Sequence, residues 1–273
     1  MVHDPRRRFF LFHACPCSWP KNGKCESSQR EAWKRKQIRT IYFGHDLCLR
    51  FKTGSALARI EGDNLTAIRT AASSALATDI LALKEVDTLG MIGTGKQAHA
   101  HVPAILEVRK VSRVLVYSRS KAHRATFVRR VSKNTSVPVS AATSAEGVAR
   151  ESDVLVLATS SAVPLLNGSS VSPGAHVNAI GAALPSSREM DTALVKRSVL
   201  IVDSVEQALA TYGDIVIPLK ERAITKAHIR AELGELVLDP SIIRRGRNDI
   251  TIFKAGGLSV LDAIFAEYIV SRL

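Results

Sequence analysis

Residues 88–102 read TLGMIGTGKQAHAHV, and this stretch decides the fold of the chain. A short apolar run ends at Gly93, and apolar residues then recur at helical spacing as far as Val108. Residues 93–98, between the two, fit the pattern G-x-G-x-x-G/A, with Ala98 in place of the third glycine. In such a turn the first glycine forms a tight bend, the second lets a pyrophosphate approach the main chain, and the small third residue lets the helix pack on the strand. The helix N-terminus then faces the phosphates.

The turn predicts a dinucleotide site, because a strand precedes it and a helix follows it, as the motif requires. The alternative is a turn of small residues that binds no ligand. The residues expected to contact the cofactor here are Gly93, Thr94, Gly95, Gln97 and Ala98.

Strand and helix patterns alternate along the chain on either side of this turn. Strands are expected at residues 87–93, 112–118, 137–142, 153–159, 174–182 and 199–204, and helices at 96–108, 121–133, 144–152 and 187–198. Strands rich in Val, Ile and Leu that alternate with helices predict a parallel sheet covered on both faces. The sequence therefore predicts an α/β protein with a Rossmann-type, doubly wound parallel sheet.

The end of the second strand predicts which dinucleotide is bound. Enzymes that use NAD usually place Asp or Glu there, on the 2′-hydroxyl of the ribose. This chain instead reads Tyr117, Ser118, Arg119, Ser120, with no acid in that window. A guanidinium can pair with a 2′-phosphate through charge-assisted hydrogen bonds. We therefore expect Ser118, Arg119 and Ser120 to bind NADP rather than NAD; the alternative is that Arg119 is an ordinary surface arginine.

Composition divides the chain near Thr53. Residues 1–52 hold 12 of the 38 basic residues but 4 of the 25 acidic ones, together with all four cysteines and both tryptophans. The net charge of +13 is therefore concentrated in this segment. It lacks the aromatic interleaving or recognition-helix context of a nucleic-acid-binding protein, which makes nucleic acid an unlikely partner. No apolar run approaches the ~18 residues of a membrane span, and no cysteine follows Cys48, so we expect a soluble, cytoplasmic protein.

The basic segment, residues 1–52, offers three further patterns, and each has a plainer explanation. Residues 6–20, RRRFFLFHACPCSWP, resemble a signal peptide, but the apolar run is too short and no clean cleavage site follows. A basic helix at 30–39 would suit RNA or a membrane surface, although a solvated charged face is commoner. Four residues are candidate zinc ligands, but their spacing matches no usual ligand pattern, so we expect no metal site; they are His13, Cys15, Cys17 and Cys25.

Six motifs, in this order, resemble the ornithine cyclodeaminase/μ-crystallin family. They are DNLTAIRTAASSALATDILA, GMIGTGKQA, VLVLATSS, HVNAIGA, AELGELVLD and ITIFKAGGLSVLDAI, and the resemblance covers residues 53–273. It implies a Rossmann domain at 86–244 and a truncated substrate and dimerisation domain made from 53–85 with 245–273, preceded by the atypical segment 1–52. It also implies a homodimer that oxidises amino acids or reduces imino acids with NAD(P).

The resemblance assigns roles to individual residues. Arg69 matches the arginine that binds the substrate carboxylate, as a bidentate guanidinium suits, although an arginine in a structural ion pair is the alternative. Asp262 matches an acid early in the closing helix, where a helix-solubilising carboxylate is a comparable explanation. The remaining matches are to cofactor-binding positions: Thr159, Ser160, Asn178, Gly181, Lys254 and Gly256, with Gly257 beside them. No catalytic residue is assigned.

Two departures from the family pattern bear on the reaction. Ornithine cyclodeaminases carry an aspartate for acid–base work where this chain has Ala183, and losing such a group typically costs ~10²–10⁴-fold in rate. That difference favours reduction of a small, cyclic imino acid, as in the ketimine-reductase branch, over ornithine cyclisation. Family members also carry a substrate-facing lysine in a G-x-K-x-V stretch, and nothing in residues 1–52 matches it.

The missing lysine motif and the apparent lack of strands in residues 1–52 favour the hypothesis that this segment replaces the family's N-terminal half, through an aberrant gene model or a frame change. A correct cofactor domain would then accompany an incomplete substrate pocket. The sequence therefore leaves three functions open: an NAD(P)-dependent imino-acid reductase, an ornithine cyclodeaminase, and a catalytically impaired NADP-binding protein.

Overall fold

A computed structural model describes residues 45–49, 56–243 and 246–272 of the chain. The zinc, signal-peptide and basic-helix patterns of the first 44 residues lie outside this range. The described chain forms two compact units: a larger one, Thr70–Gly256, and a smaller one made from the described residues before Thr70 and after Gly256. Each unit is described by itself below.

The larger unit is built on one eight-stranded sheet in which every pairing is parallel. In sheet order the strands are β5 (Val139–Ala141), β4 (Arg113–Tyr117), β3 (Thr88–Ile92), β6 (Val154–Leu157), β7 (His176–Ala179), β10 (Ile250–Lys254), β8 (Ser198–Val202) and β9 (Ile229–Glu232). The chain moves outward from β3 to β5 and then resumes on the other side of β3 with β6. This reversal creates the switch point at which doubly wound sheets bind ligands, and the predicted α/β fold class is confirmed.

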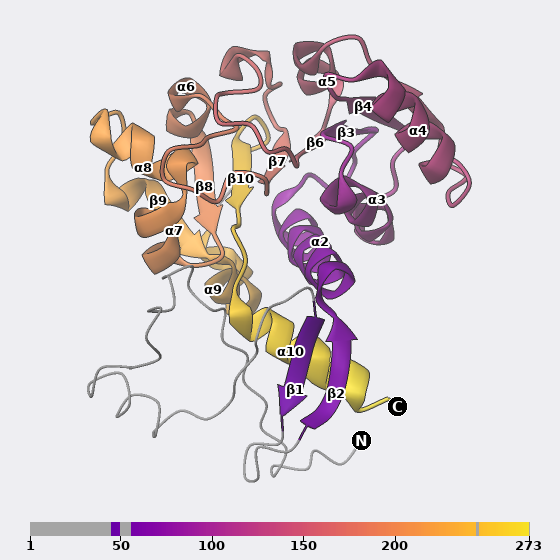
Figure 1. The fold of residues 1–273 in the computed structure, drawn as a ribbon. Coiled ribbons are helices and arrows are strands. Elements are labelled where there is room, and N and C mark those ends of the chain that lie inside the picture. The colour runs from indigo at the N-terminus through magenta and orange to yellow at the C-terminus, as the bar shows by residue number, and fades with distance from the viewer. Residues whose placement is uncertain (1–44, 50–55, 244–245, 273) are drawn as a thin grey trace. The chain divides into compact units, whose positions relative to one another are not determined.

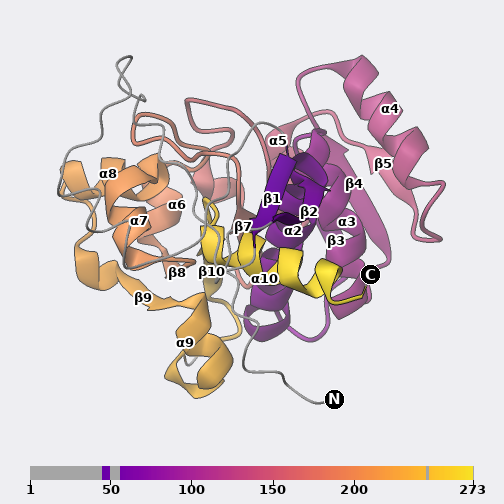
Figure 2. The same cartoon turned by 60° about the horizontal axis from the view of Figure 1, so that its bottom comes forward.

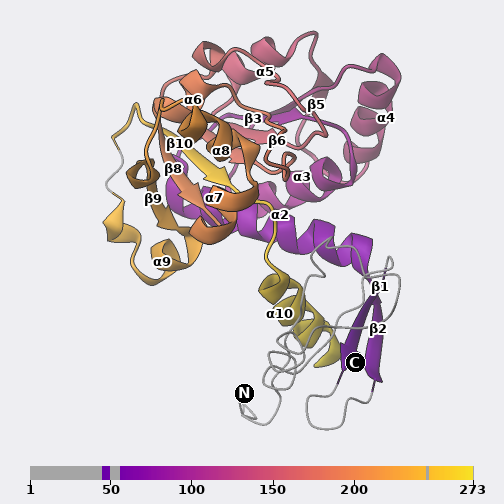
Figure 3. The same ribbon diagram turned by 60° about the vertical axis from the view of Figure 1, so that its left-hand side comes forward.

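Helices cover both faces of this sheet. They are α3 (Lys96–Val108), α4 (Lys121–Val131), α5 (Ala145–Glu151), α6 (Thr192–Lys196), α7 (Val205–Thr211), α8 (Gly213–Lys220), α9 (Leu233–Leu238) and residues 70–81 of α2 (Gly62–Leu81). Alternate strand residues belong to different cores: Leu155 packs with α5 to α8, whereas Val154 and Val156 pack with α2, α3 and α4. A third core joins α2 and α9 to β8 and β10. Figure 3 shows α5, α6 and α8 on one side of the sheet and α2, α3 and α9 on the other.

Local sequence explains where several of these helices begin. A Ser or Asp side chain accepts a hydrogen bond from the first turn of α4, α5, α6 and α7, which satisfies a main-chain N–H that has no partner within the helix. These N-cap residues are Ser120, Ser144, Asp191 and Ser204. Predicted strand positions coincide with β3 to β8, whereas the helix expected at 187–198 forms only at Thr192–Lys196.

Strand β10 comes from near the C-terminal end yet lies inside the sheet, between β7 and β8 (Figure 1). All five of its residues are buried, as expected for a central strand of a parallel sheet. Residues 245–273 were expected to belong to one domain; β10 belongs to the larger unit and α10 (Ser259–Val270) to the smaller one. The division into functional domains stays a prediction.

The smaller unit contains an antiparallel pair, β1 (His45–Leu49) and β2 (Ala56–Glu61), next to α10 (Figure 2). Leu65, in the first turns of α2, packs with Ala263 and Ala266 of α10. The sequence analysis assigned no strand to residues 1–52, and β1 corrects that expectation. Pairing with β2 explains it, because a five-residue strand gains its stability from the partner rather than from its own pattern.

No helix within the described ranges is both long enough and apolar enough to cross a membrane.

Candidate cofactor site

The glycine turn has the geometry that its sequence predicts. Gly93 adopts φ +118°, a conformation that side chains rarely allow, and a Cβ there would lie 2.2 Å from the main-chain oxygen of Ala158. An added Cβ on Gly95 would meet no atom of the described chain within 4 Å. Ala98 is fully buried in the core between α3 and the sheet. The first glycine therefore makes the bend, the second leaves its main chain open to a ligand, and the alanine allows close helix packing.

The other predicted cofactor residues lie at the same edge of the sheet. Residues 118–120, 159–160, 178–181 and 254–256 lie at or just after the carboxyl ends of β4, β6, β7 and β10. Because the strands are parallel neighbours, these ends meet at one edge, beside the glycine turn that follows β3. The structure thus brings the predicted residues of the larger unit together around the switch point.

The end of β4 presents an exposed positive charge. Arg119 is exposed and makes no hydrogen bond or ion pair with any described residue. Ser120 caps α4, and its hydroxyl accepts from the N–H of His123. The guanidinium of Arg124 instead donates to the carbonyl of Ser118 and lies 5.3 Å from the centre of the Tyr117 ring. The first turn of α4 contains no acid, which leaves the positive end of its dipole without an internal counter-charge.

Glu189 joins the loops that follow β6 and β7. Its Oε1 accepts the N–H of Thr159 at 2.7 Å and the hydroxyl of Thr159 at 2.8 Å, and its Oε2 accepts the N–H of Gly181 at 2.7 Å. These loops also touch main chain to main chain, because a Cβ on Gly181 would lie 2.0 Å from the Thr159 oxygen. One carboxylate therefore binds main-chain donors from two loops predicted to contact the cofactor.

Glu189, Asp214 and Lys254 form a charged cluster, and all three are fully buried. Asp214 Oδ1 accepts the N–H of Glu189 at 2.8 Å, its Oδ2 lies 3.2 Å from Lys254 Nζ, and that ammonium donates to the carbonyl of Ala182 at 2.5 Å. Burial raises the pKa of the Glu189 carboxyl above its usual value, the charge of Lys254 opposes this rise, and the charge of Asp214 adds to it. The Lys254 side chain is thus engaged within the protein, and any cofactor contact from this position comes from its main chain.

Asp203, at the end of β8, fixes the loop after β10. Its Oδ2 accepts the N–H of Gly256 at 3.0 Å, and its Oδ1 accepts the hydroxyl of Tyr212 at 2.8 Å. The Tyr212 ring packs so closely on Gly256 that a Cβ there would lie 2.2 Å from it. A glycine is therefore required at 256 by close contact rather than by its backbone angle.

A neutral chain of hydrogen bonds links β7, α2 and α3 on the opposite face of the sheet. Asn178 Nδ2 donates to the Thr78 hydroxyl at 2.9 Å, and that hydroxyl donates to the Ser74 carbonyl at 2.7 Å. His101 Nε2 lies 2.9 Å from the Ser74 hydroxyl, and its Nδ1 lies 2.7 Å from the Gln97 carbonyl. All four side chains of this neutral chain (Asn178, Thr78, Ser74 and His101) are fully buried, and burial lowers the pKa of His101 to about 4.

The neutral imidazole must therefore hold its proton on Nδ1, facing the Gln97 carbonyl, and accept at Nε2. Asn178 Oδ1 and Gln97 Oε1 are buried without a hydrogen-bond partner among the described residues. Both residues were predicted to bind the cofactor, and these two oxygens are acceptors that the described protein leaves unused.

The smaller unit contains the predicted substrate residue. Arg69 is buried at 4% exposure, and its Nε donates to Asp262 Oδ1 at 2.7 Å. Its Nη atoms face Gly257, where φ is +102° and a Cβ would lie 2.8 Å from both. Arg69, Asp262 and Gly257, three residues from two motifs, thus meet in one buried group. The ion pair fits both alternatives raised by the sequence: a structural pair, and a guanidinium oriented by its carboxylate.

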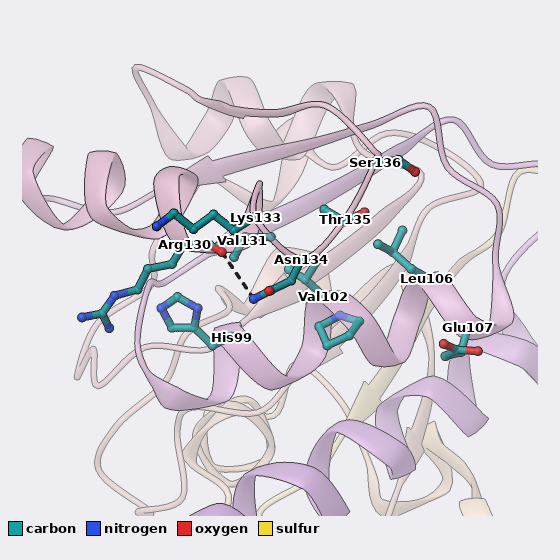
Figure 4. A pocket seen from close by; sticks show the side chains of 11 residues that line it. His99, Val102, Leu106, Glu107, Arg130, Val131, Lys133, Asn134, Thr135 and Ser136 are labelled. Atoms are coloured by element: carbon teal, nitrogen blue, oxygen red, sulfur yellow. Dashed lines mark hydrogen bonds between the residues drawn. The ribbon is translucent and has the colours of Figure 1, made fainter.

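A separate pocket of about 680 Å³ lies between α3 and the segment that leaves α4 (Figure 4). It is lined by His99, Val102, Pro103, Leu106, Glu107, Arg130, Val131, Lys133, Asn134, Thr135 and Ser136. None of the predicted site residues lines it, so it is distinct from the dinucleotide edge. Within the described ranges, no group of three or more His, Cys, Asp or Glu side chains is placed to hold a metal.

Sequence reasoning missed Glu189, Asp214 and Tyr212, and it treated Asp203 as structural. Glu189 lies in a stretch whose pattern predicted helix, and Asp214 lies in an unassigned stretch. Asp214 is marked in the sequence as a charged residue within the apolar stretch GDIVIPL, whereas Glu189 lies among polar residues and carries no such signal. Tertiary packing alone brings Asp214 to Glu189.

Comparison with known proteins places the chain in a family. The family model described as "Ornithine cyclodeaminase/mu-crystallin family" matches residues 46–273. A Delta(1)-pyrroline-2-carboxylate reductase of Bacillus cereus is 34% identical over 223 residues, which are 81% of this chain and 68% of the relative. The ketimine reductase mu-crystallin of Macropus fuliginosus is 36% identical over 216 residues, which are 79% of this chain and 65% of the relative.

A solved structure gives the same picture. The Delta(1)-pyrroline-2-carboxylate reductase of Thermococcus litoralis, in complex with NADH and L-proline, superimposes with a TM-score of 0.81 at 37% identity. The match covers 84% of this chain and 71% of that one.

Proposed function

This chain belongs to the ornithine cyclodeaminase/mu-crystallin family, and from that premise we propose that it is an NAD(P)-dependent oxidoreductase that reduces a small cyclic imino acid. The observation that carries the proposal is the glycine turn, where Gly93 bends the chain and Gly95 leaves main chain open at the switch point. The bound nicotinamide supplies the hydride. The protein supplies binding and orientation.

Arg69 is the proposed ligand of the substrate carboxylate. A guanidinium held by Asp262 at Nε keeps a fixed plane, and its two Nη atoms have the spacing of a carboxylate. We assign Asp262 the role of orienting this arginine rather than that of an acid or base. The ion pair fixes the orientation of the guanidinium, which lowers the cost of ordering it on binding.

Ala183 supports reduction over ornithine cyclisation. It is exposed beside Ala182, whose carbonyl binds Lys254, and it carries no group able to accept a proton. An imine already has the C=N bond that hydride attacks, so its reduction requires no ammonia release at this position. Ornithine cyclodeaminase activity and cofactor binding without turnover remain the competing functions.

We propose NADP as the preferred cofactor. An exposed Arg119, a Ser120 cap and a first helical turn without an acid provide positive potential where a 2′-phosphate would lie. The solved relative named above holds NADH, so this preference depends on this chain's own residues. A homodimer and a cytoplasmic location are further proposals, supported by the family resemblance and by the lack of cysteines after Cys48.

The test is a titration of the full chain with NADPH and NADH, followed by the fluorescence of the nicotinamide. The second measurement is turnover of Delta(1)-pyrroline-2-carboxylate, the compound after which the Bacillus cereus relative is named. NADPH binding with turnover supports the reductase; binding without turnover, on this and on ornithine, supports the impaired NADP-binding protein. Failure to bind either nucleotide would overturn the proposal.

Arg119→Leu tests the cofactor preference. Loss of one charge-assisted contact should weaken NADPH binding by about tenfold and leave NADH binding unchanged. Arg129→Leu, at another exposed arginine in the last turn of α4, is the matched control and should change neither. Equal effects of the two substitutions would mean that Arg119 contributes only to the general positive charge.

A further inference from the structure

We propose that Glu189 is a positioning residue whose carboxylate holds the loops after β6 and β7 in the shape that binds the dinucleotide. The inference rests on the proposed function for its ligand. It concerns a residue whose described hydrogen bonds all go to the protein and that the sequence motifs do not include.

The main-chain hydrogen bonds between β6 and β7 end just before the residues that Glu189 binds. β6 and β7 pair as far as Leu157 and Ala179, and the last ladder bond runs from the N–H of Ile180 to the Leu157 carbonyl at 2.8 Å. Beyond it, the N–H groups of Thr159 and Gly181 both point to Glu189 instead of to each other's strand. The carboxylate therefore continues the connection between the two loops after the sheet has ended.

The position of Glu189 is itself fixed. Asp214 Oδ1 accepts the N–H groups of Glu189 and Met190 at 2.8 and 2.9 Å, so the main chain carrying the carboxylate is held from behind. Lys254 binds the carbonyl of Ala182, directly after the Gly181 N–H that Glu189 binds. The segment after β7 is thus held at two consecutive residues, Gly181 and Ala182, by two side chains of opposite charge.

The choice of a carboxylate here is informative. Burying a charged group is unfavourable unless its hydrogen bonds are satisfied, and a glutamine of equal size would be cheaper to bury. Glutamine, however, has one acceptor oxygen, and its NH₂ group cannot accept from the second N–H. Only a carboxylate accepts main-chain donors from both loops at once. A pre-shaped loop pair lowers the ordering cost of binding a ligand.

The experiment compares Glu189→Gln with Asp153→Asn in the full chain. Asp153 precedes β6, and its Oδ2 accepts the N–H groups of Asp87 and Thr88 at 2.8 and 2.9 Å. It is therefore a second carboxylate that binds two main-chain donors, but at the opposite edge of the sheet. Glu189→Gln removes one of the two acceptor oxygens in use, whereas Asp153→Asn keeps the single oxygen that accepts both N–H groups and removes its charge. Both should lower the melting temperature, and only the first should affect the cofactor.

We expect Glu189→Gln to raise the Kd for NADPH by about tenfold, and Asp153→Asn to leave it within about twofold of the unsubstituted chain. In turnover, the cofactor KM should rise with the Kd while kcat changes by less than about threefold. Amide hydrogen exchange should accelerate at Thr159 or Gly181 in Glu189→Gln alone. If Glu189→Gln does not fold, Glu189→Asp keeps the charge beside Lys254 while shortening the reach, and should give the same rise in Kd.

The outcomes separate the two proposals. If the unsubstituted chain binds neither nucleotide, the proposed function fails. If it binds NADPH and Glu189→Gln or Glu189→Asp binds equally well, the positioning role is wrong. Equal weakening by Asp153→Asn would also overturn it, because the effect would then come from lost stability.

Discussion

Two groups of buried polar side chains, one on each face of the eight-stranded sheet, differ in kind. On the face covered by α5 to α8, the charged cluster places two carboxylates around one ammonium, and all three groups are fully buried. On the face covered by α2 and α3, the neutral chain runs through an amide, two hydroxyls and an uncharged imidazole. The charged cluster holds loops at the carboxyl edge of the sheet. The neutral chain of hydrogen bonds holds helices against strand β7.

This difference determines how strongly the charged cluster and the neutral chain each depend on their individual members. A buried charge loses most of its hydration, so removing one partner leaves a charge that the interior cannot stabilise. A buried neutral group left without its partner costs about 1–3 kcal/mol, which is less than an uncompensated buried charge. At neutral pH, a single substitution in the charged cluster is therefore expected to cost more unfolding free energy than one in the neutral chain of hydrogen bonds.

Lys254→Met should produce the largest effect. It removes the only cation of the cluster, and breaking a buried ion pair this way typically costs ~3–5 kcal/mol of unfolding free energy. Arg113→Met is the control, because Arg113 pairs with Glu151 at 3.1 Å while both side chains are about half exposed. Such a pair contributes ~1 kcal/mol or less. Urea denaturation followed by circular dichroism measures both, and equal losses would mean that water reaches the cluster.

Protonation of His101 should give the next largest loss of unfolding free energy, and this loss should occur only at acidic pH. Its pKa in the folded chain is about 4, below its ordinary value of 6.5, so the unfolded chain takes up the proton first. The stability contributed by the neutral imidazole is complete above pH 6.5 and is lost as the pH falls towards 4. This loss amounts to about 3 kcal/mol.

The measurement is the pH dependence of unfolding free energy in the unsubstituted chain and in His101→Gln, which should lack this loss. His123→Gln, at an exposed position on α4, is the control and should keep it. Glu189 should contribute the opposite pH dependence. Because its pKa is raised in the folded chain, the stability it contributes is lost as the pH rises through that raised pKa. Identical profiles for all three proteins would show that folding does not lower the pKa of His101.

The sequence predicted the parts of this molecule that repeat a local pattern. Six strands, three helices and the glycine turn follow from apolar spacing and from Gly93, because these features depend on neighbours along the chain. Strand β10 was not assigned to the sheet, since its place between β7 and β8 depends on contacts with residues far away in the sequence. Strand β1 was missed because a five-residue strand gains its stability from pairing with β2 rather than from its own pattern.

The residues of the candidate site also divide into those that the sequence could predict and those that it could not. Gly93, Gly95 and Ala98 were predicted with their separate roles, because each role follows from residue size at a fixed spacing. Glu189 was not, because its significance comes from Thr159 and Gly181, which the fold brings to it from 30 and 8 positions away. Lys254 was predicted as a cofactor residue from resemblance, and its fully buried side chain could be read only from the structure.

Thr78→Val should produce the smallest of these effects and tests whether the neutral chain is a set of ordinary hydrogen bonds. The substitution keeps the shape but leaves Asn178 Nδ2 buried without its acceptor, which should cost about 2 kcal/mol. Thr78→Ser keeps the hydroxyl and loses one buried methyl group, at a cost of about 1 kcal/mol. The ranking should hold from pH 7 to pH 9 in denaturation experiments, because neither partner titrates there. Equal stability of Thr78→Val and the unsubstituted chain would mean that apolar packing around Ala75 and Ala77, and not the hydrogen bond, holds this part of α2 on the sheet.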